Sequence, residues 1–354
     1  MMQQKSEIKS EIEASRTCWT EVRSRCDDDA DQPTNMEIFE SLQNHPKWGR
    51  LFRRGYYSFH MGEKIAEGAQ DEIFNCKHDE GAAPLLWKVF KRQFALLDLQ
   101  RQWPHGMFEN ANSWSYGKDN VCIIWGILLL DDGRFAIEML KYWGDLRKFI
   151  DDKMQQNNNQ NPPFTKEVAK LIMWDIAKGM RNLHRDEILH RDLKAAKGTG
   201  FWRAPEILLA LRRNAKLQLP LPLDTFTKMA DVYSYGMTCY EVLTGGKPFE
   251  GHPQSDYSWV LGGNRPKLPN YIDPSTQALL AQCWHDDPSQ RPTFESIEKQ
   301  LEPWTSVKTW MVGCKAGRTI FFSGFSKHFF YVIGSPLFLQ IGISKYMGSS
   351  IVLC

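Results

Sequence analysis

The spacing of apolar and polar residues changes along the chain, and it begins with helical patterns. Residues 5–23 carry apolar side chains every three or four positions among charged ones, which predicts an amphipathic helix. Its polar face is mixed rather than basic, so packing on a neighbouring element is favoured over binding a membrane or a partner. The acidic, proline-containing stretch Cys26–Asn35 is typical of a linker, and Met36–Leu42 predicts a second short helix.

After residue 55 the pattern changes to short strands. Lys64–Phe74 predicts two strands joined by a turn, and Leu85–Phe90 predicts another strand. Val121–Leu130 is a continuous apolar run, and the turn residues Asp131-Asp132-Gly133 that follow it predict a hairpin. This part of the chain is therefore predicted to be rich in β-strands.

The next part has a helical pattern. Gly144-Asp145-Leu146 begins a helix, where Asp145 either caps the first turn or reaches a ribose; capping is the favoured interpretation. Asp151–Phe164 is polar and of low complexity, and it predicts a mobile loop. Behind Thr165, apolar residues recur at helical spacing as far as Leu183, which predicts a long buried helix.

Composition narrows the classes of function. The chain has 44 Lys and Arg against 42 Asp and Glu, a net charge of +2, which offers no electrostatic support for nucleic-acid binding. Its 8 cysteines are scattered without a C-x-x-C pair, which favours reduced thiols over a disulfide frame or a zinc site. The polar N-terminus lacks the apolar segment of a secretory signal, so a cytoplasmic location is expected.

The C-terminal stretch Thr319–Cys354 is strongly apolar. Its longest uncharged run, Phe329–Ser344, is shorter than the about 20 residues that a spanning helix needs. A membrane span is therefore not expected.

Two motifs that carry chemistry lie almost adjacent. His190–Lys194 reads HRDLK, and Gly198–Glu206 reads GTGFWRAPE. The first matches the catalytic loop H-R-D-L of phosphoryl-transfer enzymes, and the second closes on the A-P-E that ends their activation segment.

Upstream, the hairpin can be aligned with the pattern G-x-G-x-x-G-x-V. Only Gly68 is retained, whereas Ala66 and Asp71 stand at the other glycine positions and Ile73 stands at the valine position. Glycines in such a hairpin let backbone N–H groups approach phosphate oxygens. Asp71 would place a negative charge near a polyphosphate, which is unfavourable.

Lys88 follows on the next predicted strand, at the position of the phosphate-pairing lysine in V-A-I-K. The alternative is a strand lysine that points to solvent. The sequence does not clearly indicate a glutamate on a following helix that would pair with Lys88, and Glu109 is the nearest candidate.

These motifs occur in a fixed order with two further ones, DVYSYG at Asp231–Gly236 and CWHDDPSQRPTF at Cys283–Phe294. From about Ser58 to Leu301 the chain resembles a eukaryotic protein kinase of the tyrosine-kinase-like (Raf-like) serine/threonine group, and it is similar in texture to plant members. The resemblance implies an α+β, two-lobe fold with a small β-rich N-lobe and a larger helical C-lobe. It divides the chain into a helical extension and linker (1–55), a kinase-like domain (56–301) and an apolar tail of unknown role (302–354).

The resemblance also implies roles for single residues. Asp192 would accept the proton of a substrate hydroxyl, and Lys194 would steady the transferring phosphate. The positions implied for ATP are Ala66, Gly68, Ile73 and Lys88 near the phosphates, Glu138 and Leu140 in the inter-lobe hinge that binds adenine through its backbone, and Asp145 near the ribose. The positions implied for structure are Arg191, Thr199, Glu206 paired with Arg291, and Asp231, which anchors the catalytic-loop backbone.

The chain also departs from the family pattern. Lys197 stands where the pattern has the Mg²⁺-binding Asn, and no D-F-G lies between Asp192 and Glu206. Mg²⁺ binding is therefore in doubt, although Lys197 offers a point charge that would support metal-free nucleotide binding. The lost strands should weaken the fold by uncovering apolar surface beneath the cleft.

Three interpretations stay open. The chain is an ATP-dependent serine/threonine kinase in signal transduction with impaired activity, or a pseudokinase scaffold that binds protein partners. The third is a product of alternative splicing or of a faulty gene model.

Overall fold

The computed structural model describes residues 34–44, 49–53, 59–68, 70–78, 81–96, 120–122, 124–141, 145–195, 200–217, 223–253, 256–302, 341–343 and 351–353. The helix predicted over residues 5–23 lies outside these ranges, as do Glu109, Lys197 and Thr199. The short helix predicted at Met36–Leu42 is confirmed as α2, Asn35–Gln43.

The first lobe is a six-stranded sheet in the order β1-β5-β6-β4-β3-β2. Its strands are β1 (Phe52–Arg53), β2 (Phe59–Glu67), β3 (Asp71–His78), β4 (Gly81–Phe90), β5 (Ile124–Leu129) and β6 (Phe135–Leu140). Only β1 pairs in parallel, with β5, and the other neighbours are antiparallel. The predicted strands and the hairpin turn at Asp131-Asp132-Gly133 are confirmed, and Gly133 takes the positive φ of 80° that suits a glycine.

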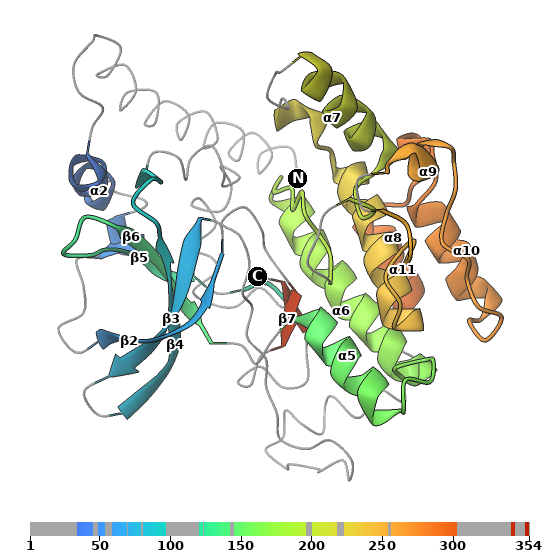
Figure 1. The fold of residues 1–354 in the computed structure, drawn as a ribbon, viewed down its shortest axis with the longest axis horizontal. Coiled ribbons are helices and arrows are strands. Elements are labelled where there is room, and N and C mark those ends of the chain that lie inside the picture. Colours follow the sequence, from blue (N-terminus) through green and yellow to red (C-terminus); the bar gives the residue numbers. More distant parts are fainter. Residues whose placement is uncertain are drawn as a thin grey trace.

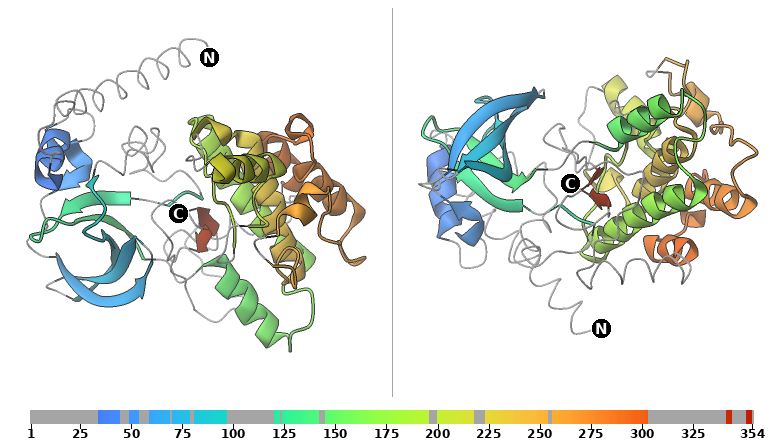
Figure 2. Two further views of the ribbon diagram at one scale, coloured as in Figure 1. Left: turned by 45° about the horizontal axis from the view of Figure 1, so that its top comes forward. Right: turned by 90° about the horizontal axis from the view of Figure 1, so that it is seen from below.

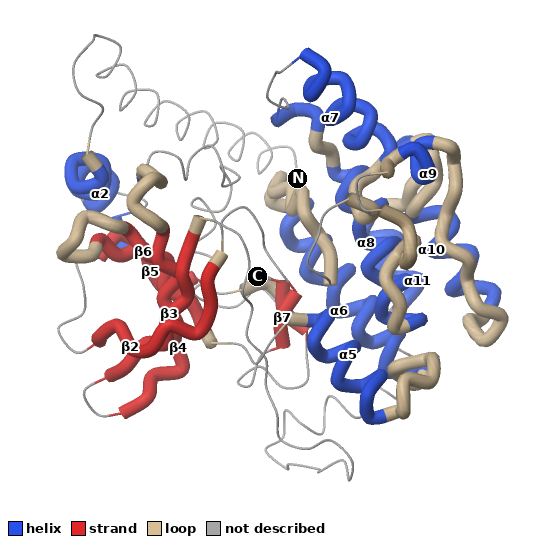
Figure 3. Tube along the Cα trace, viewed as in Figure 1, coloured by secondary structure: helices blue, strands red, loops and turns tan. Residues whose placement is uncertain are grey.

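The second lobe is helical. It comprises α5 (Leu146–Gln156), α6 (Lys166–Arg185), α7 (Pro205–Leu217), α8 (Lys228–Thr244), α9 (Ser258–Leu261), α10 (Pro274–Cys283) and α11 (Phe294–Leu301), with short 3₁₀ turns at Gly49–Leu51, Leu223–Thr225 and Pro288–Gln290. Figures 1 and 3 place the sheet and α2 on one side and these helices on the other. The α+β, two-lobe arrangement is as expected.

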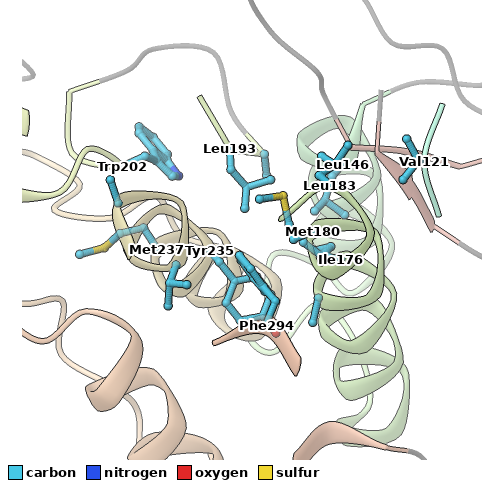
Figure 4. Packing of buried hydrophobic residues seen from close by; sticks show 14 of the residues in the cluster. Val121, Leu146, Ile176, Met180, Leu183, Leu193, Trp202, Tyr235, Met237 and Phe294 are labelled. Atoms are coloured by element: carbon cyan, nitrogen blue, oxygen red, sulfur yellow. The ribbon is translucent and has the colours of Figure 1, made fainter. Parts of the chain in front are cut away.

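The helical lobe is organised around α6 and α8. α6 begins at the predicted cap, because the Thr165 side chain accepts a hydrogen bond from Val168 N. Its apolar face carries Ile176, Met180 and Leu183. Figure 4 shows Ile176 and Met180 facing Tyr235 of α8, whereas Met237 lies on another side of α8. All five side chains are buried.

One loop prediction is wrong. Asp151–Phe164 was expected to be a loop, but α5 continues to Gln156 and the turn begins at Asn157. The reason is that α5 buries Leu146, Arg147 and Ile150 on one side and turns most of its other polar residues toward solvent. Arg147 bonds Asp151 one turn along at 2.7 Å, and Met154 packs so closely on Gly245 that a Cβ there would collide with it.

Part of the C-terminal tail is also described. β7 (Ile341–Ile343) and β8 (Ile351–Leu353) form a two-stranded antiparallel sheet. β7 contacts α5 and β8 contacts α6, on the side of the helical lobe that faces the sheet (Figure 2). Among the helices of the described part of the chain, none is both long and apolar enough to cross a membrane.

Candidate active site

The predicted phosphate hairpin is formed by β2 and β3. Glu67 pairs with Glu72, and Gly68 N donates a hydrogen bond of 2.8 Å to Asp71 O. Ala66 lies opposite Ile73 in this ladder, so the two residues that replace a glycine and the valine are cross-strand neighbours.

Asp71 is turned inward, toward Lys88. Asp71 pairs with Phe90 and Ile73 pairs with Lys88, so the side chains of Asp71 and Lys88 are diagonal neighbours on one face of the sheet. Lys88 Nζ lies 3.7 Å from Asp71 Oδ2. Lys88 is 8% exposed, so the solvent-pointing alternative for this lysine is wrong.

Burial dominates the electrostatics of this pair. Burial raises the pKa of the Asp71 carboxyl, and the charge of Lys88 acts against that rise. Burial also lowers the pKa of Lys88, and the Asp71 charge opposes it. Within the described residues neither Asp71 carboxylate oxygen accepts a hydrogen bond. An unbonded buried carboxylate in this position does not fit a polyphosphate.

The hinge positions Glu138 and Leu140 lie on β6. β6 pairs with β4 on one side and with β5 on the other, and Leu140 lies opposite Leu85. The Glu138 side chain is buried and accepts a hydrogen bond of 2.9 Å from Trp87 Nε1. Burial raises the pKa of Glu138, and that hydrogen bond opposes the rise. Glu138 is also paired with Trp87 on one side and with Gly126 on the other, whereas Leu140, at the end of β6, is paired only with Leu85 among the described strands.

Asp145 is the N-cap of α5. Its Oδ1 accepts a hydrogen bond of 2.7 Å from Lys148 N. The capping interpretation of this residue is confirmed.

The catalytic-loop motif lies between α6 and α7, where Asp192 and Lys194 are both buried. Lys194 Nζ bonds Asp192 Oδ2 directly. Burial raises the pKa of Asp192 to about 6, against the charge and hydrogen bond of Lys194. This pair places a carboxylate and an ammonium group side by side.

Asp231, at the start of α8, holds the backbone of this loop. Its carboxylate accepts hydrogen bonds of 2.8 Å from His190 N and 2.8 Å from Arg191 N, and it contacts His184 Nε2 at 2.8 Å. Burial acts to raise the pKa of Asp231, but the bonds and charges of the two histidines lower it. Arg191 has a positive φ of 67°, so the anchored backbone is held in the left-handed region.

Glu206 and Arg291 form the second implied structural contact. Arg291 donates hydrogen bonds of 2.7 Å and 2.9 Å to the two Glu206 oxygens. Arg291 also donates to Met229 O at 3.0 Å. The A-P-E segment is thereby joined to the loop before α11.

Glu241 of α8 was missed by the sequence reasoning. It is fully buried and accepts hydrogen bonds from Arg147 at 3.1 Å, Trp202 Nε1 at 2.7 Å and Ala195 N at 3.3 Å. Burial raises the pKa of Glu241 to about 7, against the charge of Arg147. A carboxylate within an apolar helical run was the available signal, because such a residue is rarely buried without partners.

The predicted site residues thus fall into two clusters. Gly68, Asp71 and Lys88 belong to the sheet, whereas Asp192, Lys194 and their supports belong to the helical lobe. Within the residues described, no group of three His, Cys, Asp or Glu side chains is placed to hold a metal ion.

Known proteins resemble the same region. The family model for protein tyrosine and serine/threonine kinases matches residues 59–198 and 196–301. A probable serine/threonine-protein kinase of Dictyostelium discoideum is 31% identical over 189 residues, which are 45% of this chain and 13% of the relative. A light-sensor protein kinase of Ceratodon purpureus is 30% identical over 207 residues, which are 45% of this chain and 16% of the relative.

The serine/threonine/tyrosine-protein kinase HT1 of Arabidopsis thaliana is 27% identical over 194 residues, 44% of this chain and 46% of the relative. The chain therefore spans less than half the length of each of these relatives. Since the family model matches more than half of the chain, the chain belongs to the protein tyrosine and serine/threonine kinase family.

Proposed function

We propose that this chain is a serine/threonine-type protein kinase domain of the tyrosine-kinase-like group, with its catalytic loop kept and its phosphotransfer from ATP impaired. The observation that carries the proposal is the Asp192–Lys194 pair on a loop whose backbone is anchored by Asp231. Such an anchored loop keeps a base and a cation in place before a substrate arrives.

Asp192 would act as the base that accepts the proton of a protein hydroxyl. With a pKa of about 6 this carboxyl is mostly ionised at neutral pH, as a base must be. Lys194 supports Ser/Thr rather than Tyr as the acceptor, and several relatives are named serine/threonine kinases. The Glu138–Leu140 backbone would keep the adenine site.

The proposed impairment rests on the short connection after Asp192. Lys197 stands at the position of the metal-binding Asn, and no D-F-G follows before Glu206. The family model matches the chain as two segments that meet at residues 196–198, which supports a missing segment at that point. Losing one preorganised electrostatic group costs about 10²–10³ in rate, and here two metal ligands are absent.

We propose that the chain is divided into three parts. Residues 1–55 would be an extension, 56–301 the kinase domain and 302–354 an apolar tail. From the family we expect protein substrates or protein partners and a cytoplasmic location. Cys76, Cys122, Cys239 and Cys283 are buried and form no disulfide with one another, which suits reducing conditions.

A second candidate function is a pseudokinase that holds a protein partner through its helical lobe. The observation that favours it is the Asp71–Lys88 pair, because a lysine engaged by a buried carboxylate is less available to phosphates. Partner capture that is unchanged in Asp192→Asn would support this function.

Transfer of labelled phosphate from ATP to a protein mixture tests the first proposal. We expect slow transfer by the full chain, loss of transfer in Asp192→Asn, and no change in the control Asp131→Asn at an exposed turn. Transfer that persists in Asp192→Asn would contradict the catalytic assignment.

The impairment is tested by inserting, between Ala196 and Lys197, a segment that begins with the metal-binding Asn of the family pattern and ends with its Asp-Phe-Gly. We expect transfer to rise by about 100-fold or more. An unchanged rate would show that the short connection is not what limits transfer. Sequencing native transcripts across the same junction tests the splicing or gene-model interpretation, which an insert in most transcripts would favour.

A further inference from the structure

The Asp71 carboxylate lies in the space that a glycine leaves open. A Cβ built on Gly68 would lie 2.9 Å from Asp71 Oδ1 and 3.4 Å from Asp71 Cγ. The carboxylate therefore packs directly on the Cα of Gly68. In a phosphate-covering hairpin, the missing Cβ of glycine is what lets a phosphate approach the backbone.

The same carboxylate is also the counter-ion of Lys88. Its Oδ2 lies 3.7 Å from Lys88 Nζ, and the two side chains are 0% and 10% exposed. The pairing of β3 with β4 fixes the position of the Asp71 side chain. Ile73 is paired with Lys88, and Asp71, two residues before Ile73, lies on the same face of the sheet. Gly68 and Lys88 are both expected to contact a phosphate, and both lie against Asp71 instead.

The energetics oppose replacement of Asp71 by a polyphosphate. The carboxylate is fully buried and neither oxygen accepts a hydrogen bond among the described residues, so it depends on nearby positive charges, chiefly that of Lys88 and also that of Lys91. A phosphate that drew Lys88 away would leave this buried charge uncompensated. Two negative groups would also lie close together in a medium of low dielectric, where repulsion is strong.

The other carboxylates of the hairpin do not share this arrangement. Glu67 bonds Lys64 at 2.8 Å and Lys91 at 2.7 Å, and its side chain is 48% exposed. Glu72 bonds Lys64 at 3.0 Å and Arg134 at 3.1 Å. Only Asp71 of these three is directed at Lys88 within the described structure, which makes Glu67 a matched control.

We infer that Asp71 is an internal substitute for phosphate and the residue that sets the ligand specificity of the proposed nucleotide site. It favours uncharged adenine ligands of the adenosine type over ATP. The inference rests on the proposed function, since it assumes that the adenine site at the hinge is kept.

Binding of adenosine and of ATP without metal, measured by calorimetry on the full chain, tests the inference. The wild type should bind adenosine more tightly than ATP. Asp71→Asn should tighten ATP binding by about tenfold or more and change adenosine binding by less than about twofold. Glu67→Gln should leave both affinities within about twofold. Adenosine binding also reports that each variant is folded, and Asp71→Gly serves as a second variant.

Lys88→Met completes the cycle. In Asp71→Asn it should remove the gain in ATP affinity. In the wild type it leaves the buried Asp71 carboxylate without its nearest counter-ion, so adenosine binding is used to check that this variant is folded. Two outcomes would overturn this inference and leave the proposed adenine site standing. One is that the wild type binds ATP as tightly as adenosine. The other is that neither Asp71→Asn nor Asp71→Gly binds ATP more tightly than the wild type does. Failure of every variant to bind adenosine would overturn the proposed adenine site and this inference with it.

Discussion

Arg291 holds Glu206 with two hydrogen bonds, at 2.7 Å and 2.9 Å, across 85 positions of the chain. The Arg291 side chain is fully buried and that of Glu206 is 28% exposed. The contact joins the segment after the catalytic loop to the end of the domain. It fixes the start of α7 to the loop before α11.

Arg291→Ala should destabilise the protein by about 3–5 kcal/mol. The variant loses two charge-assisted hydrogen bonds to Glu206, whose side chain is 28% exposed, and the bond to Met229 O, and it leaves a cavity where the buried Arg291 side chain was. Urea unfolding measures the change. Lys228→Ala, which breaks an exposed pair with Glu187 at 2.8 Å, is the control and should cost less than about 1 kcal/mol. Equal effects of the two variants would contradict the structural role of Arg291.

Glu241→Gln should change how stability depends on pH. The pKa of Glu241 is about 7 in the folded protein, against an ordinary value of 4.5. The folded state thus binds more protons than the unfolded state between these values, so this group's contribution to stability is complete below pH 4.5 and is lost as pH rises through 7. The loss is about 3 kcal/mol.

Unfolding free energies of wild type and Glu241→Gln at pH 4.5 and 7.5 test this. The variant should gain about 3 kcal/mol relative to the wild type between the two pH values. Burial lowers the pKa of His190 to about 4, so its contribution to stability increases with pH below 6.5, opposite to that of Glu241. His190 is present in both proteins, so its contribution cancels in the comparison. A difference that does not vary with pH would refute the buried, proton-binding state of Glu241.

Gly68→Ala should destabilise the hairpin lobe by about 1–3 kcal/mol, because the new methyl group would lie 2.9 Å from Asp71 Oδ1. The same substitution in an Asp71→Gly background should cost less, since the carboxylate is gone. Thermal unfolding of the four proteins gives the coupling between the two sites. Additive effects would show that the Asp71 side chain does not lie against Gly68.

Asp145→Ala should cost about 1 kcal/mol through loss of the N-cap of α5, whereas Asp145→Asn should keep most of the stability. Asp152→Ala breaks an exposed pair with Lys148 at 3.4 Å and should stay within about 0.5 kcal/mol. Denaturant midpoints compare the three variants. An alanine variant as stable as the wild type would show that the cap carries no stability.

Local elements were predictable where a short-range signal repeats. α6 follows from Thr165 as a cap and from apolar spacing up to Leu183, and the β5–β6 hairpin follows from its turn residues. The prediction failed at Asp151–Phe164, because composition alone cannot separate the exposed side of α5 from a polar loop. Packing of Met154 on Gly245 decided that the helix continues.

The site was predictable in identity but not in pairing. The motifs indicated Lys88 and Asp192 as functional positions, and Asp71 as a charge near phosphates. They could not show that Asp71 turns inward to Lys88, since that depends on which residues face each other across β3 and β4. Glu241 was missed for the same reason, because its partner Arg147 lies 94 positions away.

The sequence by itself determined the family, the order of the elements and the identity of the catalytic loop. These are properties of neighbouring residues, which repeat in short motifs and in apolar spacing. Only the tertiary structure decided which buried charges meet, such as Asp71 with Lys88 and Glu206 with Arg291. A buried charge takes its partner from whatever packs beside it, and packing brings together residues that are distant in the chain.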